Sequence, residues 1–260
     1  MCDSVLPAGQ YQICVRCQPE IAYVTEPCCK KCGKPLQTGS VWNDMASGMP
    51  GAEDLREEAG ERESGRNALE ALFTPDAAND QEYCLDCEER DSSFLYGHSL
   101  FVYDSRMQGS MARFKYRQRK EYARYYAAEM VRVYGAWIRS LHPDAMIPVP
   151  IHAKRMRKRG FNQAQELAER ISRICGVPVL DDWLLRCRNT LPQKELSRTE
   201  RKVNLQGAFT LAKQLNQTPE CVIIIDDIYT TGSTIEACSA VLKEAGVQRI
   251  YFLCICTGKG

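Results

Sequence analysis

The feature that most constrains this fold is a short aliphatic run, residues 222–225, that ends in two adjacent acids, Asp226 and Asp227. Adjacent acids at the end of a buried strand are costly unless a ligand or a cation neutralises them. A hydroxyl-rich loop at 230–234 and a predicted helix from Ser233 follow at once. The first N–H groups of a helix and its positive dipole end favour an anion such as phosphate. This order predicts a strand–helix unit with an anion-binding loop.

The second part of the chain alternates short apolar runs with longer amphipathic stretches. Such alternation favours the α/β class, a parallel sheet with helices on both faces, in which ligands gather at the carboxyl ends of the strands. We expect Gly97 to bend the first strand, Asp104 to cap the helix after it, and Gly176 to end a later helix. Strands are predicted at 93–103, 145–152, 222–226 and 249–256, and helices at 105–117, 121–141, 161–175 and 233–245.

A phosphorylated ribose would satisfy both halves of the acid and hydroxyl motif. Phosphate oxygens accept hydrogen bonds from the hydroxyls and N–H groups of the loop, and Gly232 lets the backbone approach an oxygen closely. Carboxylates accept hydrogen bonds from vicinal ring hydroxyls. The motif therefore predicts a ligand with a phosphate on the loop and its ribose hydroxyls on the acids.

The net charge of +1 hides an uneven distribution along the chain. Residues 1–90 carry 17 acids and 8 bases, a balance of −9, whereas residues 91–260 carry 16 acids and 26 bases, a balance of +10. A basic surface is expected of a protein that binds phosphate or nucleic acid, although it can also be a merely solvated face. The apolar runs are shorter than the ~18 residues of a membrane span, and no secretory signal is visible. We therefore expect a soluble cytoplasmic protein without membrane insertion.

Cysteine spacing predicts structural zinc in the first part of the chain. Two cysteines separated by two residues can bind one tetrahedral Zn²⁺ together, and two such pairs complete a closed site. Gly33 after Cys32 supplies the left-handed turn that such zinc knuckles often require. Three pairs have this spacing: Cys14 with Cys17, Cys29 with Cys32, and Cys84 with Cys87.

The pairing of these cysteines is open from the sequence. The second and third pairs would make one complete site, and the first pair then needs two further ligands, for which Cys2 and Cys28 are at hand. Because MCDSVLP resembles the second half of another knuckle, our hypothesis is that the natural chain begins upstream of Met1, with a cysteine three residues before Cys2. The later cysteines, several of them within apolar runs, are expected to be small core residues: Cys175, Cys187, Cys221, Cys238, Cys254 and Cys256.

An acidic segment rich in glycine, proline and alanine separates the second and third cysteine pairs. It has few aromatic residues and the composition of a disordered segment. We interpret residues 37–83 as an insertion that loops out of a zinc ribbon. The predicted organisation is a zinc-ribbon module at 1–92, which includes this insertion, followed by an α/β domain at 93–260.

The run VIIIDDIYTTGST resembles the signature of type I phosphoribosyltransferases, which bind 5-phosphoribosyl-1-pyrophosphate (PRPP) together with Mg²⁺. The resemblance implies the type I phosphoribosyltransferase fold for the α/β domain. It also implies that Asp226 and Asp227 meet the ribose hydroxyls. The 5′-phosphate would then be held by five consecutive residues: Thr230, Thr231, Gly232, Ser233 and Thr234.

Two further segments, 147–168 and 188–209, are similar to segments of the ComF family of competence proteins. Members of this family join an N-terminal double zinc ribbon to a phosphoribosyltransferase-like domain, so the resemblance covers both predicted modules. It implies a role in DNA uptake during natural competence and a partnership with a helicase-like ATPase. The acidic insertion and the incomplete first set of cysteines depart from the family pattern.

Basic residues gather in two stretches of the second module. The first, AKRMRKRGFNQ, follows a strand, and in phosphoribosyltransferase folds the corresponding loop faces pyrophosphate. The second, RFKYRQRKEYARYY, interleaves bases with four tyrosines; cations and stacking aromatics together hold single-stranded nucleic acid. Tyrosines at helical spacing are also typical core residues. The candidates for pyrophosphate or nucleic-acid binding are Arg155, Arg157, Lys158, Arg159, Lys115 and Arg117.

Different classes of function stay open from the sequence. A phosphoribosyltransferase, of the glycosyltransferase class, would position PRPP and stabilise its leaving group, with residues 193–204 as a mobile hood. A DNA-handling factor would keep the PRPP pocket without turnover and bind single-stranded DNA. A PRPP-sensing regulator is a third alternative. The sequence assigns neither an acceptor substrate nor a catalytic residue.

Overall fold

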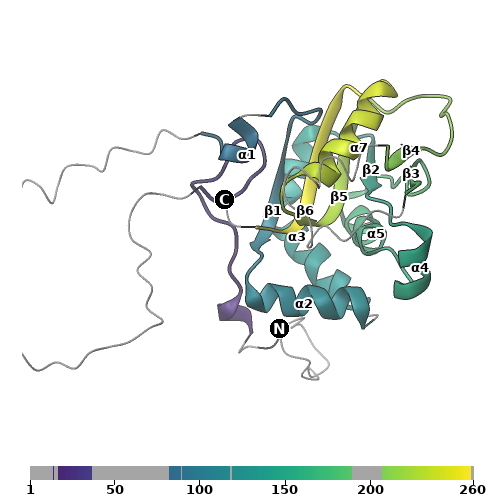
Figure 1. Ribbon diagram of the computed structural model, residues 1–260. Helices are drawn as coiled ribbons and strands as arrows, with labels where there is room; N and C mark the ends of the chain where they lie inside the picture. Colours follow the sequence, from purple (N-terminus) through teal and green to yellow (C-terminus); the bar gives the residue numbers. More distant parts are fainter. Residues whose placement is uncertain are drawn as a thin grey trace, which may run out of the picture. The chain divides into compact units, whose positions relative to one another are not determined.

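Most of the chain is described by a computed structural model (Figure 1). The predicted acidic insertion lies outside the described residues, apart from Glu82 and Tyr83, and so do the predicted hood and Cys2. In the described part of the chain, no helix is both long and apolar enough to cross a bilayer. The described residues are Cys14 and the ranges 17–36, 82–88, 90–117, 119–188 and 207–258.

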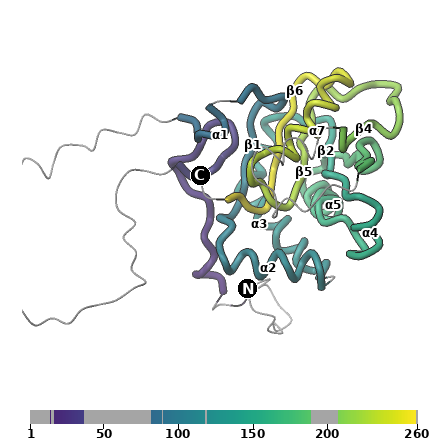
Figure 2. Tube along the Cα trace, in the orientation of Figure 1, coloured from purple at the N-terminus to yellow at the C-terminus, as the bar shows by residue number. Residues whose placement is uncertain are grey.

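A sheet of four parallel strands forms the centre of the fold (Figure 2). The strand order is β1-β6-β5-β2, and all three neighbouring pairs are parallel. The predicted α/β class is therefore confirmed. Strand β5 continues past the aliphatic run through both acids, and Asp226 lies opposite Cys254 on β6. The four strands are β1 (Tyr96–Val102), β2 (Ala145–Pro148), β5 (Cys221–Tyr229) and β6 (Arg249–Thr257).

Both faces of this sheet are covered. Along β5, Ile223 and Ile225 belong to one core cluster, which includes residues of three long helices. Val222 and Ile224 belong to a second cluster, which includes residues of a fourth long helix and of the second and third C-x-x-C pairs. A strand that is buried on both faces is apolar at successive positions, which explains the continuous aliphatic run. The helices are α2 (Ser105–Tyr116), α3 (Tyr122–Leu141) and α5 (Gln163–Cys175) on the first face and α7 (Ser233–Glu244) on the second.

The helix ends follow local sequence signals. Asp104 caps α2, and its carboxylate accepts a hydrogen bond from the N–H of Met107 at 2.8 Å, as predicted. Helix α5 ends at Gly176, which has a φ of +75°. Helix α3 ends at His142, a residue with a φ of 48° in the left-handed region. Asp104 thus fixes where α2 begins after β1, and Gly176 and His142 fix where α5 and α3 end.

Three features differ from the predictions. Strands β3 (Leu184–Arg186) and β4 (Phe209–Leu211) form a small antiparallel sheet that is too short to leave a pattern in the sequence. The basic stretch expected as a loop forms helix α4 (Ala153–Arg159). Gly97 lies inside β1 and not at a bend; an added Cβ would come within 2.5 Å of the Phe252 ring, so close packing requires the glycine. The remaining elements are η1 (Gln18–Glu20) and α1 (Leu85–Glu88).

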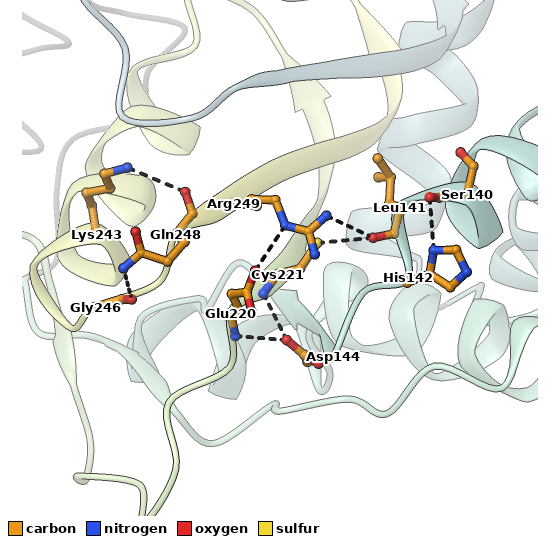
Figure 3. A network of polar contacts seen from close by, with 10 residues as sticks. All are labelled: Ser140, Leu141, His142, Asp144, Glu220, Cys221, Lys243, Gly246, Gln248 and Arg249. Carbon is orange, nitrogen blue, oxygen red and sulfur yellow. Dashed lines mark hydrogen bonds and ion pairs between the residues drawn. The ribbon is translucent and has the colours of Figure 1, made fainter.

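A polar network lies at the amino ends of β5 and β6 (Figure 3), whereas the acid pair lies towards the carboxyl end of β5. The carboxylate of Asp144 accepts hydrogen bonds from the N–H groups of Glu220 and Cys221, at 2.8 and 2.9 Å. The Arg249 guanidinium donates to the Leu141 carbonyl at 3.3 Å and lies 3.6 Å from the Glu220 carboxylate. The network ties the start of β5 and β6 to the end of α3 and leaves the carboxyl ends open for a ligand.

The later cysteines are core residues in four of six cases. Cys187 is exposed, so the prediction is wrong for it, and Cys175 is half-buried. The buried side chains are those of Cys221, Cys238, Cys254 and Cys256, which lie in or against the central sheet.

Candidate functional site

A cavity opens at the carboxyl ends of the parallel strands. Its volume is about 360 Å³, which falls within the range of roughly 300–1,000 Å³ found for small-molecule sites. Its walls come from the carboxyl ends of β5 and β2, from α2, α4 and β3, and from the start of α7. Eight of the candidate residues line it: Asp226, Asp227, Thr230, Thr234, Lys115, Arg155, Lys158 and Arg159.

The acid pair is partly neutralised by a lysine from α2. Lys115 Nζ lies 2.8 Å from Asp227 Oδ2, and both side chains are 15% exposed. Burial lowers the pKa of Lys115, but the charge and hydrogen bond of Asp227 outweigh this and leave the pKa raised. Asp226 accepts a hydrogen bond from the Asp227 N–H at 2.8 Å. Burial, and then the charge of Asp227, raise the pKa of Asp226 to about 7.

The substitution Asp226→Asn is expected to raise the melting temperature at about pH 8. The rise is about 2–4 °C for each kcal/mol by which the free energy of unfolding increases. Because the pKa of Asp226 is higher in the folded state, the folded protein retains a proton that the unfolded chain releases. The stability from this group is present near pH 4 and is lost as the pH rises towards about 7. Melting curves at about pH 5 and about pH 8 measure the effect. A difference in melting temperature between variant and wild type that does not grow with pH would contradict this prediction. Asp182→Asn, at an exposed acid, is the control.

Three arginines line the same cavity as the acids, Arg155 and Arg159 on α4 and Arg186 on β3. The guanidinium of Arg159 lies 5.2 Å from the ring centroid of Tyr116, and that of Arg186 lies 5.3 Å from that of Phe209. Burial, and then a neighbouring arginine, lower the pKa of both Arg155 and Arg186. Since these cations repel one another, a ligand with several negative charges is favoured here.

Three polar residues that line this cavity are not among the predicted site residues: Tyr103, Tyr116 and Arg186. Arg186 was missed because it lies on a three-residue strand, outside either basic stretch. Tyr116 was considered only as one of four stacking candidates, and Tyr103 gave no signal. Their place in the cavity depends on tertiary contacts that no local pattern records.

The hydroxyl-rich loop enters α7 through Gly232, which has a φ of +74°. Among the described residues no side chain caps α7, so the first N–H groups of the helix are available to a ligand. The hydroxyls of Thr231 and Ser233 lie 2.9 Å apart. Thr230 and Thr234 line the cavity. The loop thus presents hydroxyl and N–H donors at the rim of the cavity.

Five candidate residues do not line the cavity. Thr231, Gly232 and Ser233 form the body of the loop between the two lining threonines. Arg157 and Arg117 are exposed outside it. The structure therefore divides the six basic candidates into four that line the cavity and two that lie on the outer surface.

The four tyrosines of the second basic stretch divide into core residues and one residue that lines the cavity. Tyr125 and Tyr126 are buried core residues, and the Tyr126 hydroxyl lies 2.6 Å from that of Ser110. Tyr122 is half-buried against the same core cluster. Tyr116 is 59% exposed, and of the four it is the one that lines the cavity. The alternative of core tyrosines therefore holds for Tyr125 and Tyr126.

Four cysteines form a cluster whose geometry fits a tetrahedral metal. The sulfur atoms of the second and third C-x-x-C pairs all lie within 4.8 Å of one another, and all four residues are buried. Cys32 Sγ and Cys84 Sγ are 3.6 Å apart. Four thiolates bound tetrahedrally to Zn²⁺ at ~2.3 Å would be about 3.8 Å apart. The cluster comprises Cys29, Cys32, Cys84 and Cys87.

The remaining early cysteines lie apart from this cluster. The Cys28 thiol donates to the Thr25 carbonyl at 3.1 Å, and burial, followed by the charge of Glu26, raises its pKa to about 11. The N–H of Cys17 donates to the Cys14 carbonyl at 3.0 Å, which closes a tight turn. Because Cys2 lies outside the described residues, a second metal site stays a prediction.

Comparison with known proteins identifies the family. The chain is 31% identical over 172 residues to the competence protein ComFC of Bacillus subtilis (strain 168), covering 63% of this chain and 67% of that protein. The chain belongs to the ComF family. Competence protein F of Haemophilus influenzae is 40% identical over 109 residues, 42% of this chain and 48% of that protein. The DNA utilization protein YhgH of Escherichia coli (strain K12) is 34% identical over 114 residues, 44% of this chain and 49% of that protein.

The ComF chain thus spans about half the length of two of these relatives. Its residues 1–46 match the model of the double zinc ribbon domain, in agreement with the predicted N-terminal module. The match ends before Cys84 and Cys87, which complete the four-cysteine cluster in the structure. Among solved structures, a purine phosphoribosyltransferase from Pyrococcus horikoshii Ot3 aligns with 51% of this chain and 73% of that chain, at a TM-score of 0.33 and 18% identity.

Proposed function

We propose that this ComF-family protein binds PRPP, or a related phosphoribosyl ligand, in the cavity at the end of β5. The observation that carries the proposal is that the acid pair, the lining threonines of the hydroxyl-rich loop and three arginines surround one cavity. The 5′-phosphate would accept hydrogen bonds from the loop and the start of α7. The ribose hydroxyls would donate to Asp226 and Asp227, and the pyrophosphate would pair with Arg155 and Arg159.

Two metal ions complete the proposal. Mg²⁺ would arrive with PRPP and supply charge neutralisation for its pyrophosphate. Zn²⁺ would be structural, held by the four-cysteine cluster. If the protein is a phosphoribosyltransferase, the arginines stabilise the departing pyrophosphate while the acids hold the ribose in place.

Calorimetric titration of PRPP, with and without Mg²⁺, tests this proposal. We expect Mg²⁺-dependent binding by the wild type and a loss of at least about 100-fold in affinity for Asp226→Asn/Asp227→Asn, because both ribose acceptors lose their charge. Asp182→Asn is the matched control, since Asp182 is an exposed acid paired with Lys213 at 2.5 Å. No binding by a zinc-loaded wild type, or equal binding by the double variant, would contradict the proposal.

A second candidate is a factor that handles single-stranded DNA during natural competence, with a helicase-like ATPase as the partner that the family resemblance implies. Two relatives are named competence proteins and a third is named a DNA utilization protein. The observation that favours this role is the pair of exposed arginines outside the cavity, Arg117 and Arg157, with exposed Tyr116 next to Arg117 in the chain. Cations and an aromatic ring of this kind suit a single strand.

Charge reversal separates the two candidates. Arg117→Glu/Arg157→Glu is expected to weaken binding of a single-stranded oligonucleotide by at least about tenfold and to leave PRPP affinity unchanged, because neither side chain lines the cavity. Arg155→Glu is expected to weaken PRPP binding and to leave oligonucleotide affinity unchanged. Fluorescence anisotropy for the oligonucleotide and calorimetry for PRPP measure the two affinities. If both variants weakened the binding of both ligands equally, DNA and PRPP would share one site, and the assignment of DNA to the outer surface would be wrong.

A further inference from the structure

The segment that follows the third cysteine pair reaches the hydroxyl-rich loop directly; this loop, residues 230–234, is named the phosphate loop after its proposed ligand. Arg90, three residues after Cys87, donates from Nη1 to the carbonyl oxygen of Thr231 at 2.7 Å. Ser93 holds the first turn of α7, because its hydroxyl and N–H donate to the Glu236 carboxylate at 2.7 and 3.1 Å. Two contacts therefore fix the loop and the helix start from the side of the four-cysteine cluster.

Tyr229 provides a second connection between the cysteine cluster and the loop. Its ring stacks on Phe252 with centroids 4.7 Å apart and planes within 2°, and the Nζ of buried Lys34 lies 5.9 Å from its centroid. Lys34 lies two residues after Cys32 and pairs with Asp86, beside Cys87, at 2.5 Å. The Tyr229 ring thus belongs to the same core cluster as the four cysteines.

The two connections converge on Gly232. A Cβ at this position would overlap the Tyr229 hydroxyl and would lie 2.9 Å from Arg90 Nη1. The Tyr229 hydroxyl is buried and, in the described part of the chain, has no hydrogen-bond partner. The floor of the phosphate loop is therefore formed by Tyr229 of β5 together with Arg90, from the segment that follows the cysteine cluster.

We propose that Arg90 and the four-cysteine cluster are positioning elements of the phosphate loop, so that zinc occupancy and phosphoribosyl binding are positively coupled. The coupling to a ligand rests on the proposed function; the ordering of the loop does not. Loss of zinc frees the residues flanking Cys32 and Cys87, and with them the contact of Lys34 with the Tyr229 ring and the hydrogen bond from Arg90 to the loop. By linkage, a ligand that needs the ordered loop then raises zinc affinity by the same factor by which zinc raises ligand affinity.

Hydrogen exchange of the peptide that covers residues 229–236 tests the ordering without any ligand. Removal of zinc by a chelator, and separately Arg90→Ala, are expected to speed exchange in this peptide several-fold, with Arg90→Lys intermediate. Lys30→Ala is the matched control, because Lys30 lies in the same knuckle and pairs with exposed Glu82. Zinc content, measured by colorimetric chelation, is expected to be normal in all three single variants. Exchange that is unchanged after zinc removal and in Arg90→Ala would overturn the proposal.

Measurements of PRPP binding and of zinc release distinguish failure of this inference from failure of the proposed function. Arg90→Ala with normal zinc content is expected to bind PRPP about tenfold more weakly, and PRPP is expected to slow zinc release from the wild type. A wild type that does not bind PRPP would contradict the proposed function and leave the exchange result to decide the ordering of the loop. If Arg90→Ala lost its zinc, Arg90→Lys would decide the case; wild-type exchange and affinity in Arg90→Lys at full zinc content would then count against the proposal.

Discussion

Cys32→Ser is expected to remove the bound zinc and to lower the melting temperature by at least about 10 °C. Cys32 is fully buried, and its sulfur lies 3.6 Å from that of Cys84 inside a cluster that fits tetrahedral zinc. Because the binding free energy of a structural zinc is also folding free energy, one missing thiolate destabilises the module and the core around it. Zinc content and a thermal melt, each with and without a chelator, measure the effect.

Cys187→Ser is the matched control for this prediction. Cys187 is exposed and lies outside the four-cysteine cluster, so the variant is expected to keep both its zinc and its melting temperature. The chelator is expected to lower the melting temperature of the wild type to about that of Cys32→Ser. A Cys32→Ser variant with wild-type zinc content and stability would show that the cluster does not hold the metal.

Gly232→Ala is expected to abolish PRPP binding and to destabilise the protein by about 2–4 kcal/mol. The φ of +74° disfavours any residue with a Cβ, and the new methyl would overlap the Tyr229 hydroxyl and press on Arg90. Relief of this overlap must move the loop, because Tyr229 is held by its stack on Phe252. Urea unfolding measures the stability, and calorimetry measures PRPP affinity.

Gly176→Ala separates the backbone cost from the clash. Gly176 has almost the same φ, +75°, but an added Cβ would meet nothing within 4 Å. This variant is expected to lose only about 1 kcal/mol and to bind PRPP as the wild type does. Equal stability losses in the two variants, with unchanged PRPP affinity in both, would refute the role assigned to the loop.

Local chemistry explains which parts of the fold were predictable from the sequence. The cap at Asp104 and the stop at Gly176 are signals that a few neighbouring residues determine, and the structure has both. The aliphatic run before Asp226 predicted a strand buried on both faces. The C-x-x-C spacing predicted structural zinc, because few functions other than metal binding require that spacing, but it left open which pairs share a site. The structure brings Cys32 and Cys84 together across 52 positions.

The unpredicted parts depend on contacts between segments far apart in the chain. Arg186 enters the cavity because β3 pairs with β4, and three-residue strands leave no periodic pattern. Arg90 reaches Thr231 across 141 positions, which neither spacing nor composition could reveal. The burial of Tyr126 and the exposure of Tyr116 depend on which face of the helices packs on the sheet, and the sequence left that choice open.

The most direct test of the central claim is a crystal structure of the zinc-loaded protein with Mg²⁺ and PRPP. We expect the 5′-phosphate at the start of α7, between Thr230 and Thr234, with the ribose hydroxyls on Asp226 and Asp227. The pyrophosphate is expected on the side of the cavity that Arg155 and its neighbours line. A cavity without PRPP at saturating ligand, or PRPP bound elsewhere on the surface, would contradict the account.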